Sequence, residues 1–164
     1  MMNRILIAEP KKCTGCQLCE LACALQQATP ATPANPAKPR INIVNWQDSG
    51  FFLPVMCQHC DDPPCMAVCP RKAIYRDDRS GCVTVDYDLC VSCQKCAAVC
   101  PFGAIGFDPD YARVYKCDLC LGEPQCVKYC PYQALAFVSA DAIAYPRLRL
   151  SAKRIGPSRL KHRK

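Results

Sequence analysis

Cysteine placement constrains this chain more than any other feature, because 16 of its 17 cysteines fall into four short runs. Each run begins with Cys-x2-Cys, adds a third cysteine and ends with Cys-x3-Cys, and Cys82 alone lies outside the runs. Three thiolates from one tight loop can hold three corners of a single metal cluster. The four runs are Cys13, Cys16, Cys19, Cys23; Cys57, Cys60, Cys65, Cys69; Cys90, Cys93, Cys96, Cys100; and Cys117, Cys120, Cys126, Cys130.

The third run, CVSCQKCAAVCP, has the spacing that bacterial ferredoxins use for 4Fe-4S clusters, including Pro101 after its last cysteine. In two-cluster ferredoxins the fourth cysteine of a run ligates the neighbouring cluster, so that two runs interlock. The second and fourth runs have a longer middle gap but keep the Cys-x3-Cys-Pro ending. We therefore predict four 4Fe-4S clusters as the cofactors.

Two other uses of cysteine compete with this interpretation. Disulfide scaffolds belong to secreted chains, and the cysteine count here is odd. Zinc is the stronger alternative, because two Cys-x2-Cys units can form one tetrahedral site, and a zinc protein with a basic tail could associate with nucleic acid. Zinc gives no reason for the third cysteine or for the repeated Cys-x3-Cys-Pro ending. Iron-sulfur clusters remain favoured, and nucleic acid is not expected as a partner.

Short strand-like segments flank the cysteine runs. NRILIA precedes the first run and ALAFV follows the fourth, whereas AIYRDDRSGCVTVD between the second and third runs has the pattern of a β-hairpin. The predicted fold class is α+β, with two nested bacterial ferredoxin-like modules, short helices, hairpins and many loops. The inner module spans residues 51–109, and the discontinuous outer module joins residues 1–27 to residues 110–145.

The nesting predicts which cysteines share a cluster, since each run lends its last cysteine to its partner run. Pairing the first run with the second and the third with the fourth is the alternative. Unequal spacing disfavours it, because the second and third runs are the closer neighbours. The predicted ligand sets are Cys57, Cys60, Cys65 with Cys100; Cys90, Cys93, Cys96 with Cys69; Cys13, Cys16, Cys19 with Cys130; and Cys117, Cys120, Cys126 with Cys23.

Two further segments are predicted outside the modules. Residues 28–50 form a proline-rich surface insert, in which proline recurs at every third position from 30 to 39, as in a polyproline II strap or a linker. Trp46, Phe51 and Phe52 are expected to pack over the inner module, with a docking role as the alternative. Residues 146–164 form a basic tail that carries eight of the 21 Lys and Arg residues and no acidic residue. The tail could stay solvated, bind a partner or support self-association.

Several side chains near the cysteines could tune a cluster. Lys11, Lys12, Lys95 and Lys116 lie beside predicted ligands and could raise cluster potentials, with ordinary surface lysines as the alternative. His59 could donate a hydrogen bond to a cluster or be a plain loop residue, and Cys82 is expected to be buried. No catalytic residues are predicted, and no cofactor-binding residues beyond the cluster ligands.

The location of the chain is predicted from what the sequence lacks. No segment approaches the roughly 20 apolar residues of a membrane span. The residues before Cys13 leave no room for a secretory signal. We therefore expect a cytoplasmic protein without a membrane span, in a reducing cell interior.

The runs CTGCQLCELAC, CQHCDDPPC, CVSCQKCAAVCPFGAI and YKCDLC with CVKYCP resemble those of a known family. It comprises the four-cluster ferredoxin-type subunits of molybdenum, tungsten and nickel redox complexes. Within it, the chain looks most like the small iron-sulfur subunit of bacterial tungsten-dependent aldehyde oxidoreductase. The resemblance implies an electron-transfer subunit, not an enzyme itself, which links a catalytic oxidoreductase subunit to another redox partner, with a flavin-containing subunit as one candidate. The alternative is the same role in a carbon monoxide dehydrogenase, hydrogenase or formate dehydrogenase complex.

Overall fold

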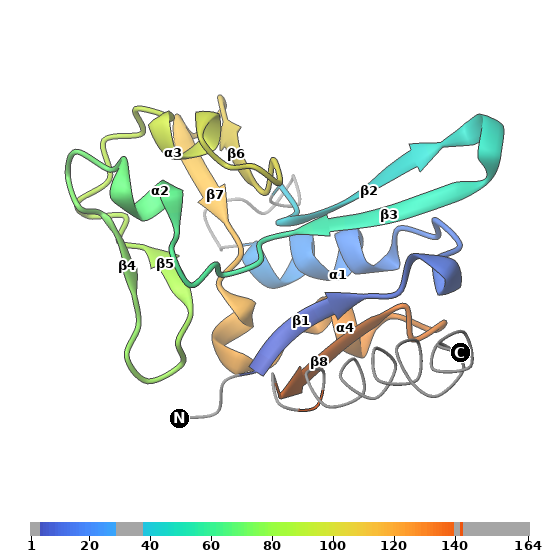
Figure 1. The fold of residues 1–164 in the computed structure, drawn as a ribbon. Coiled ribbons are helices and arrows are strands. Elements are labelled where there is room, and N and C mark those ends of the chain that lie inside the picture. The colour runs from blue at the N-terminus through green and yellow to red at the C-terminus, as the bar shows by residue number, and fades with distance from the viewer. Residues whose placement is uncertain (1–3, 29–37, 140–141, 143–164) are drawn as a thin grey trace, which may run out of the picture.

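The computed structural model describes residues 4–28, 38–139 and 142 (Figure 1). All 17 cysteines lie in this part of the chain. The predicted basic tail, and residues 29–37 of the predicted proline-rich insert, lie outside it.

The strands form two-stranded antiparallel sheets, and the helices between them are short. This mixture of strands, short helices and loops confirms the predicted α+β class. The paired strands are β1 (Arg4–Ala8) with β8 (Leu135–Ser139), β2 (Ile41–Trp46) with β3 (Phe51–Met56), β4 (Ile74–Arg76) with β5 (Val83–Val85), and β6 (Ile105–Asp108) with β7 (Arg113–Lys116). The helices are α1 (Leu18–Gln27), α2 (Pro64–Ala67), α3 (Lys95–Ala98) and α4 (Gln125–Lys128), with 3₁₀ turns η1 (Pro10–Lys12), η2 (Gln47–Ser49) and η3 (Leu119–Gly122).

The first and last strands of the described chain lie side by side. In the β1–β8 pair, Leu6 faces Phe137 and Ala8 faces Leu135, as the hydrophobic patterns of NRILIA and ALAFV predict. The pairing brings the first and fourth cysteine runs together, and α1 packs against α4 (Figure 1).

Two hairpins cross the predicted module boundaries. β2 lies in the predicted insert and pairs with β3, whereas β6 of the predicted inner module pairs with β7 of the predicted outer one. Boundaries at residues 50 and 109 therefore fall within hairpin turns. Each hairpin ties its two neighbouring segments together by backbone hydrogen bonds, so the segments are not structurally independent.

Buried side chains form two clusters. One gathers β1, β8, α1 and the fourth run around Leu6, Ile41 and Leu119, and the other gathers the second and third runs around Val83, Ile105 and Val114. Cys82 is 5% exposed, so the prediction that it is buried is confirmed. It belongs to the first cluster although its neighbour Val83 belongs to the second. The two cores thus meet at the start of β5.

Proline decides how far the helices extend. The second, third and fourth runs have Pro70, Pro101 and Pro131 after their last cysteine, and α2, α3 and α4 each have four residues. Proline disfavours helical geometry in the residue before it and lacks the N–H that a helix interior needs. No proline follows Cys23, and α1 continues to ten residues. No described helix combines the length and the apolar character that a bilayer crossing requires.

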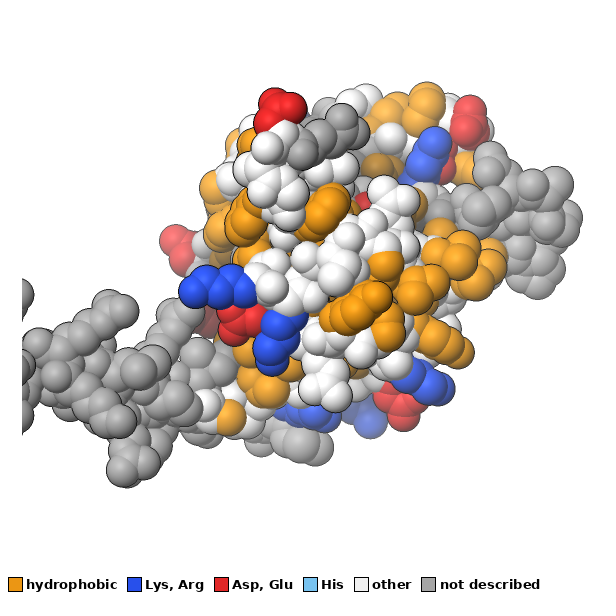
Figure 2. All heavy atoms as spheres, turned by 90° about the vertical axis from the view of Figure 1, so that its right-hand side faces the viewer, with side chains coloured by type: hydrophobic (Ala, Val, Ile, Leu, Met, Phe, Trp, Pro, Cys, Tyr) orange, Lys and Arg blue, Asp and Glu red, His pale blue; other side chains and the backbone are white. Residues whose placement is uncertain are grey.

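The tip of the β2–β3 hairpin carries aromatic side chains at the surface. Trp46 and Phe51 are 49% and 42% exposed, and their ring centroids lie 5.7 Å apart. The expectation that both pack over the inner module is therefore wrong, because they pack on each other across the hairpin; Phe52 is half-buried. Figure 2 shows this side of the molecule, where hydrophobic side chains reach the surface between scattered charged groups.

Candidate metal centres

The Cys-x2-Cys loops share one backbone feature. The residue just before the second cysteine has a positive φ in every run, between 47° and 71°. This left-handed conformation turns the chain sharply, so that the two flanking cysteines can face a common volume. The four residues are Gly15, His59, Ser92 and Leu119.

Three cavities are lined by cysteines, and each combines two runs. In every case the first three cysteines of one run meet the last cysteine of another. The three cavities are similar in size. The three groups are Cys57, Cys60, Cys65 with Cys100; Cys90, Cys93, Cys96 with Cys69; and Cys13, Cys16, Cys19 with Cys130.

The remaining run-ending cysteine, Cys23, lies near the fourth run. Burial raises the pKa of Cys126 to about 12, and the nearby Cys23 and Cys120 raise it further. Cys23 also raises the pKa of Cys120, although burial is the larger cause. Cys23 and Cys126 belong to the same buried cluster. The structure thus brings together cysteines from each of the four predicted ligand sets.

Backbone N–H groups point at the run-ending sulfurs. In the three Cys-Pro runs the donor is a buried alanine four residues after the cysteine, with N···Sγ distances of 3.3 Å for Ala73, 3.4 Å for Ala104 and 3.2 Å for Ala134. Cys23 instead accepts a hydrogen bond from the backbone N–H of Arg40 at 3.2 Å. Such donors stabilise negative charge on a ligating sulfur.

The cysteine side chains are suitable ligands for iron-sulfur clusters. All 17 cysteines are free of disulfide bonds. Burial raises the pKa of Cys19 to about 12, so this thiol would be protonated at neutral pH in the absence of a metal. A cluster would have to displace that proton to bind the thiolate. Among the described residues, no group of three or more His, Cys, Asp or Glu side chains is arranged around a single metal ion.

The cavity with Cys57 is also lined by three nitrogen-bearing side chains, Gln58, His59 and Lys116. His59 Nδ1 accepts a hydrogen bond from Val83 N–H at 3.1 Å. The Lys116 ammonium donates to the carbonyls of Val83 and Cys117. Because Val83 belongs to one buried cluster and Cys117 packs against the other, we name this cavity, lined by Cys57, Cys60, Cys65 and Cys100, the junction site.

Sequence reasoning did not separate Lys116 from the other lysines beside predicted ligands. Lys11, Lys12 and Lys95 are exposed, whereas Lys116 is 3% exposed. The sequence signal that could have identified Lys116 is the alternation of side chains along β7, which places Lys116 on the same face as the buried Val114. A polar residue on the apolar face of a strand marks a position where the polar group has a partner.

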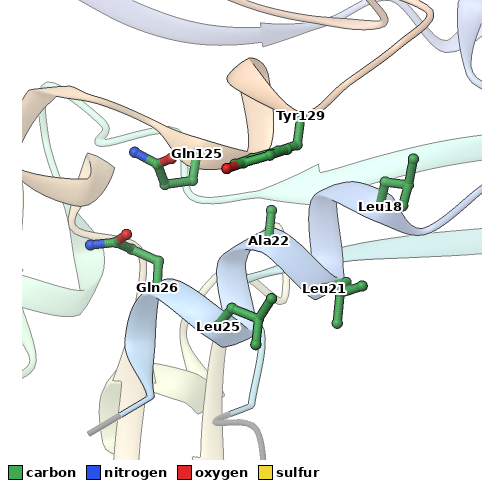
Figure 3. Close-up of a pocket in the computed structure, with 7 residues that line it drawn as sticks. All are labelled: Leu18, Leu21, Ala22, Leu25, Gln26, Gln125 and Tyr129. Atoms are coloured by element: carbon green, nitrogen blue, oxygen red, sulfur yellow. The ribbon is translucent and has the colours of Figure 1, made fainter.

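An apolar groove of about 390 Å³ lies between α1 and α4 (Figure 3). Leu18, Leu21 and Leu25 come from α1, and Tyr129 lies across from them beyond α4. The other described lining residues are Ala22, Gln26 and Gln125, so none of the described lining side chains is an acid or a basic residue. The opposite face of α1 buries Cys19 and Cys23.

Comparison with known proteins identifies the domain type. Residues 49–140 match the 4Fe-4S dicluster domain, and residues 10–26 match a 4Fe-4S binding domain. The chain belongs to the 4Fe-4S dicluster domain family. The predicted kind of cofactor is thereby confirmed, since a 4Fe-4S dicluster domain and a further 4Fe-4S binding segment together imply multiple 4Fe-4S clusters.

Relatives of this chain are subunits of redox complexes. It is 42% identical over 107 residues to formate hydrogenlyase subunit 2 of Escherichia coli K12, covering 65% of this chain and 49% of the relative. It is 39% identical over 104 residues to hydrogenase-4 component A of the same organism, covering 63% and 47%. The iron-sulfur subunit of the arsenate respiratory reductase of Shewanella sp. ANA-3 is 34% identical over 104 residues, covering 63% and 44%. The chain thus spans slightly less than half the length of these relatives.

Among solved structures, a chain of the active site complex BamBC of benzoyl coenzyme A reductase matches with a TM-score of 0.49. The two sequences are 25% identical, and the match covers 96% of this chain and 94% of the other.

Proposed function

We propose that this chain is an electron-transfer iron-sulfur subunit. It carries single electrons through four 4Fe-4S clusters between a catalytic metal-cofactor subunit and another redox partner. The observation that carries the proposal is the set of three cavities in which three cysteines of one run meet the last cysteine of another. This exchange of ligands characterises two-cluster ferredoxins.

The same cavities support the nested pairing of modules. The second run shares cavities with the third, and the first run shares a cavity with the fourth. Sequential pairing would combine the first run with the second. The proposed fourth set, Cys117, Cys120 and Cys126 with Cys23, follows from the proximity of Cys23 to Cys120 and Cys126.

The chain's own residues would hold the clusters, tune them and place them close together. Each 4Fe-4S cluster supplies a centre that gains or loses one electron. The run-ending sulfurs receive backbone N–H groups that stabilise their charge. The inner and outer sites approach each other where Cys57 lies near Cys117: burial chiefly raises the pKa of Cys117, and Cys57 adds to the rise. This proximity supports a continuous electron path through both modules.

We propose a tungsten-dependent aldehyde oxidoreductase as the catalytic partner, because the chain as a whole looks most like the small iron-sulfur subunit of that enzyme. A hydrogenase or formate dehydrogenase complex is the second candidate. It is favoured by the similarity to formate hydrogenlyase subunit 2 and hydrogenase-4 component A. In either complex a flavin-containing subunit is a candidate second partner, and the cytoplasm the proposed location.

Anaerobic purification of the native complex tests these proposals. The chain should contain about 16 iron and about 16 sulfide, since each cluster has four of each. Tungsten in a co-purifying subunit would support the aldehyde oxidoreductase, whereas nickel would select a hydrogenase or carbon monoxide dehydrogenase complex, and molybdenum a formate dehydrogenase. A colourless chain that contains zinc would contradict the electron-transfer role.

A further inference from the structure

A hydrogen bond at Nδ1 fixes the orientation of the His59 ring. Val83 N–H donates to Nδ1, and the thiol sulfur of Cys82 lies 3.3 Å from the same nitrogen. A backbone N–H can only donate, so Nδ1 is the acceptor and the ring proton of a neutral imidazole is on Nε2.

The Nε2–H of His59 has no partner within the described protein. Nε2 is buried, and no described protein atom accepts a hydrogen bond from it. His59 itself lines the junction site. A buried donor without an acceptor costs about 1–3 kcal/mol, so such groups normally meet a ligand, a cofactor or a water. The group held by the four cysteines would supply sulfur acceptors.

Lys116 brings a positive charge to the same cavity. It is 3% exposed, and the two acceptors of its ammonium are backbone carbonyls, which carry no net charge. A buried ammonium is costly unless a negative charge compensates it. Lys116 lines the junction site, where thiolate-ligated iron would carry net negative charge.

The other three Cys-x2-Cys loops lack this arrangement. Gly15, Ser92 and Leu119 occupy the positions that correspond to His59, with similar positive φ values. None of these side chains has an N–H donor. At this loop position, therefore, the junction site has a side-chain N–H donor and the other three loops do not.

We propose that His59, through Nε2–H, and Lys116, through its ammonium, stabilise the reduced form of the cluster in the junction site. This cluster would then accept an electron more readily than it would without these two groups, and hold it where the two modules meet. One electron enters from the redox partner, no bond is made or broken, and the added charge is balanced by the N–H dipole and the ammonium. The inference rests on the proposed ligand set of the junction site.

Redox titration of His59 and Lys116 variants, monitored by electron paramagnetic resonance, tests this role. His59→Leu removes the donor, and Leu119 shows that leucine fits this backbone conformation. We expect the reduction equilibrium constant of one cluster to fall about tenfold, or about 59 mV for a one-electron couple. His59→Gln retains an N–H and should restore part of the potential, and Lys116→Met should lower the potential of the same cluster.

Matched controls separate tuning from general disturbance. Ser92→Ala changes the corresponding position of the third run, and Lys95→Met removes an exposed lysine beside Cys96. Both should leave the potential of the junction cluster unchanged. A His59→Leu protein with full iron content and unshifted potentials would overturn the proposal while leaving the electron-transfer role intact. A wild-type chain without about 16 iron would instead overturn the electron-transfer role.

A measurement on a protein that retains His59 tests the proposal even if the His59 variants fail to fold. The chain has two histidines, so His162→Gln leaves His59 as the single labelled site after growth with ¹⁵N-histidine. Pulsed electron paramagnetic resonance of the reduced protein should show a ¹⁵N coupling to one cluster. Absence of that coupling in a protein with full iron content would refute the contact.

Discussion

The last cysteine of the first run has a different structural environment from the last cysteines of the other three runs. In the second, third and fourth runs, a one-turn helix ends two residues before the Cys-Pro pair, and a residue with positive φ follows that pair, at Lys72, Gly103 and Gln133. A buried alanine at the next position then donates its N–H to the cysteine sulfur. The first run has none of this, because α1 continues past Cys23, and the donor is Arg40, 17 residues further along the chain.

The difference shows that one ligand environment can be built locally or through tertiary structure. In the Cys-Pro runs, five consecutive residues contain both the sulfur and its donor. At Cys23 the donor is placed by packing of the segment around β2 against α1, and Glu20 of α1 accepts a hydrogen bond from Ile43 N–H of β2. The environment of Cys23 therefore depends on contacts that the local sequence cannot supply.

The largest expected effect is the loss of a ligand at either kind of run ending. Cys100→Ser should disturb the junction site, because its sulfur lines that cavity, and should spare the cavity of Cys90, Cys93 and Cys96. Cys23→Ser should disturb the set of Cys120 and Cys126. Up to four iron atoms per chain would be lost in each variant. Iron analysis with Mössbauer spectroscopy checks this, and damage confined to the cluster of the mutated run would refute the exchange of ligands.

A second prediction tests the role of the missing proline. Ala24→Pro would give the first run the Cys-Pro ending of the others, but Ala24 is buried inside α1. Proline there removes a helical hydrogen bond and clashes with the preceding turn, so we expect the free energy of unfolding to fall by about 3 kcal/mol or more. Pro101→Ala, the converse change in the third run, should cost less than about 1 kcal/mol. Anaerobic urea unfolding followed by circular dichroism measures both, and equal losses would contradict the distinction.

The cysteine groups and the strand segments could be predicted from the sequence because their signals are local. The spacing of each run, the proline after Cys69 or Cys100, and the alternation in NRILIA are all readable within a few residues. The strands that pair with β3 and β6 could not be predicted from such local signals. A strand flanked by two apolar strands can pair with either, and the choice depends on the whole sheet. The burial of Lys116 and the Arg40 donor likewise arise from contacts between distant segments.

A third prediction compares two glycines with similar positive φ. At Gly15, φ is 71° and an added Cβ would overlap the Phe52 ring of β3, whereas Gly103 has a φ of 60° and nothing within 4 Å. Both alanine variants incur about 1–2 kcal/mol for the left-handed conformation. Gly15→Ala should lose a further 1–3 kcal/mol, roughly the cost of overpacking. Thermal unfolding compares the two, and similar losses would show that Phe52 moves aside freely.

The smallest expected effect concerns the hydrogen bond between Glu20 of α1 and Ile43 of β2, which lies near Cys23 and its Arg40 donor. Glu20→Ala removes the carboxylate that accepts from Ile43 N–H, so we expect a loss of about 1–3 kcal/mol and faster amide exchange at β2. Glu123→Ala is the control, because Glu123 is exposed. Hydrogen exchange of peptides covering Ile41–Trp46 measures the opening of the strand. Unchanged exchange in Glu20→Ala would mean that packing alone positions β2, and that the Arg40 donor reaches Cys23 without help from the Glu20 hydrogen bond.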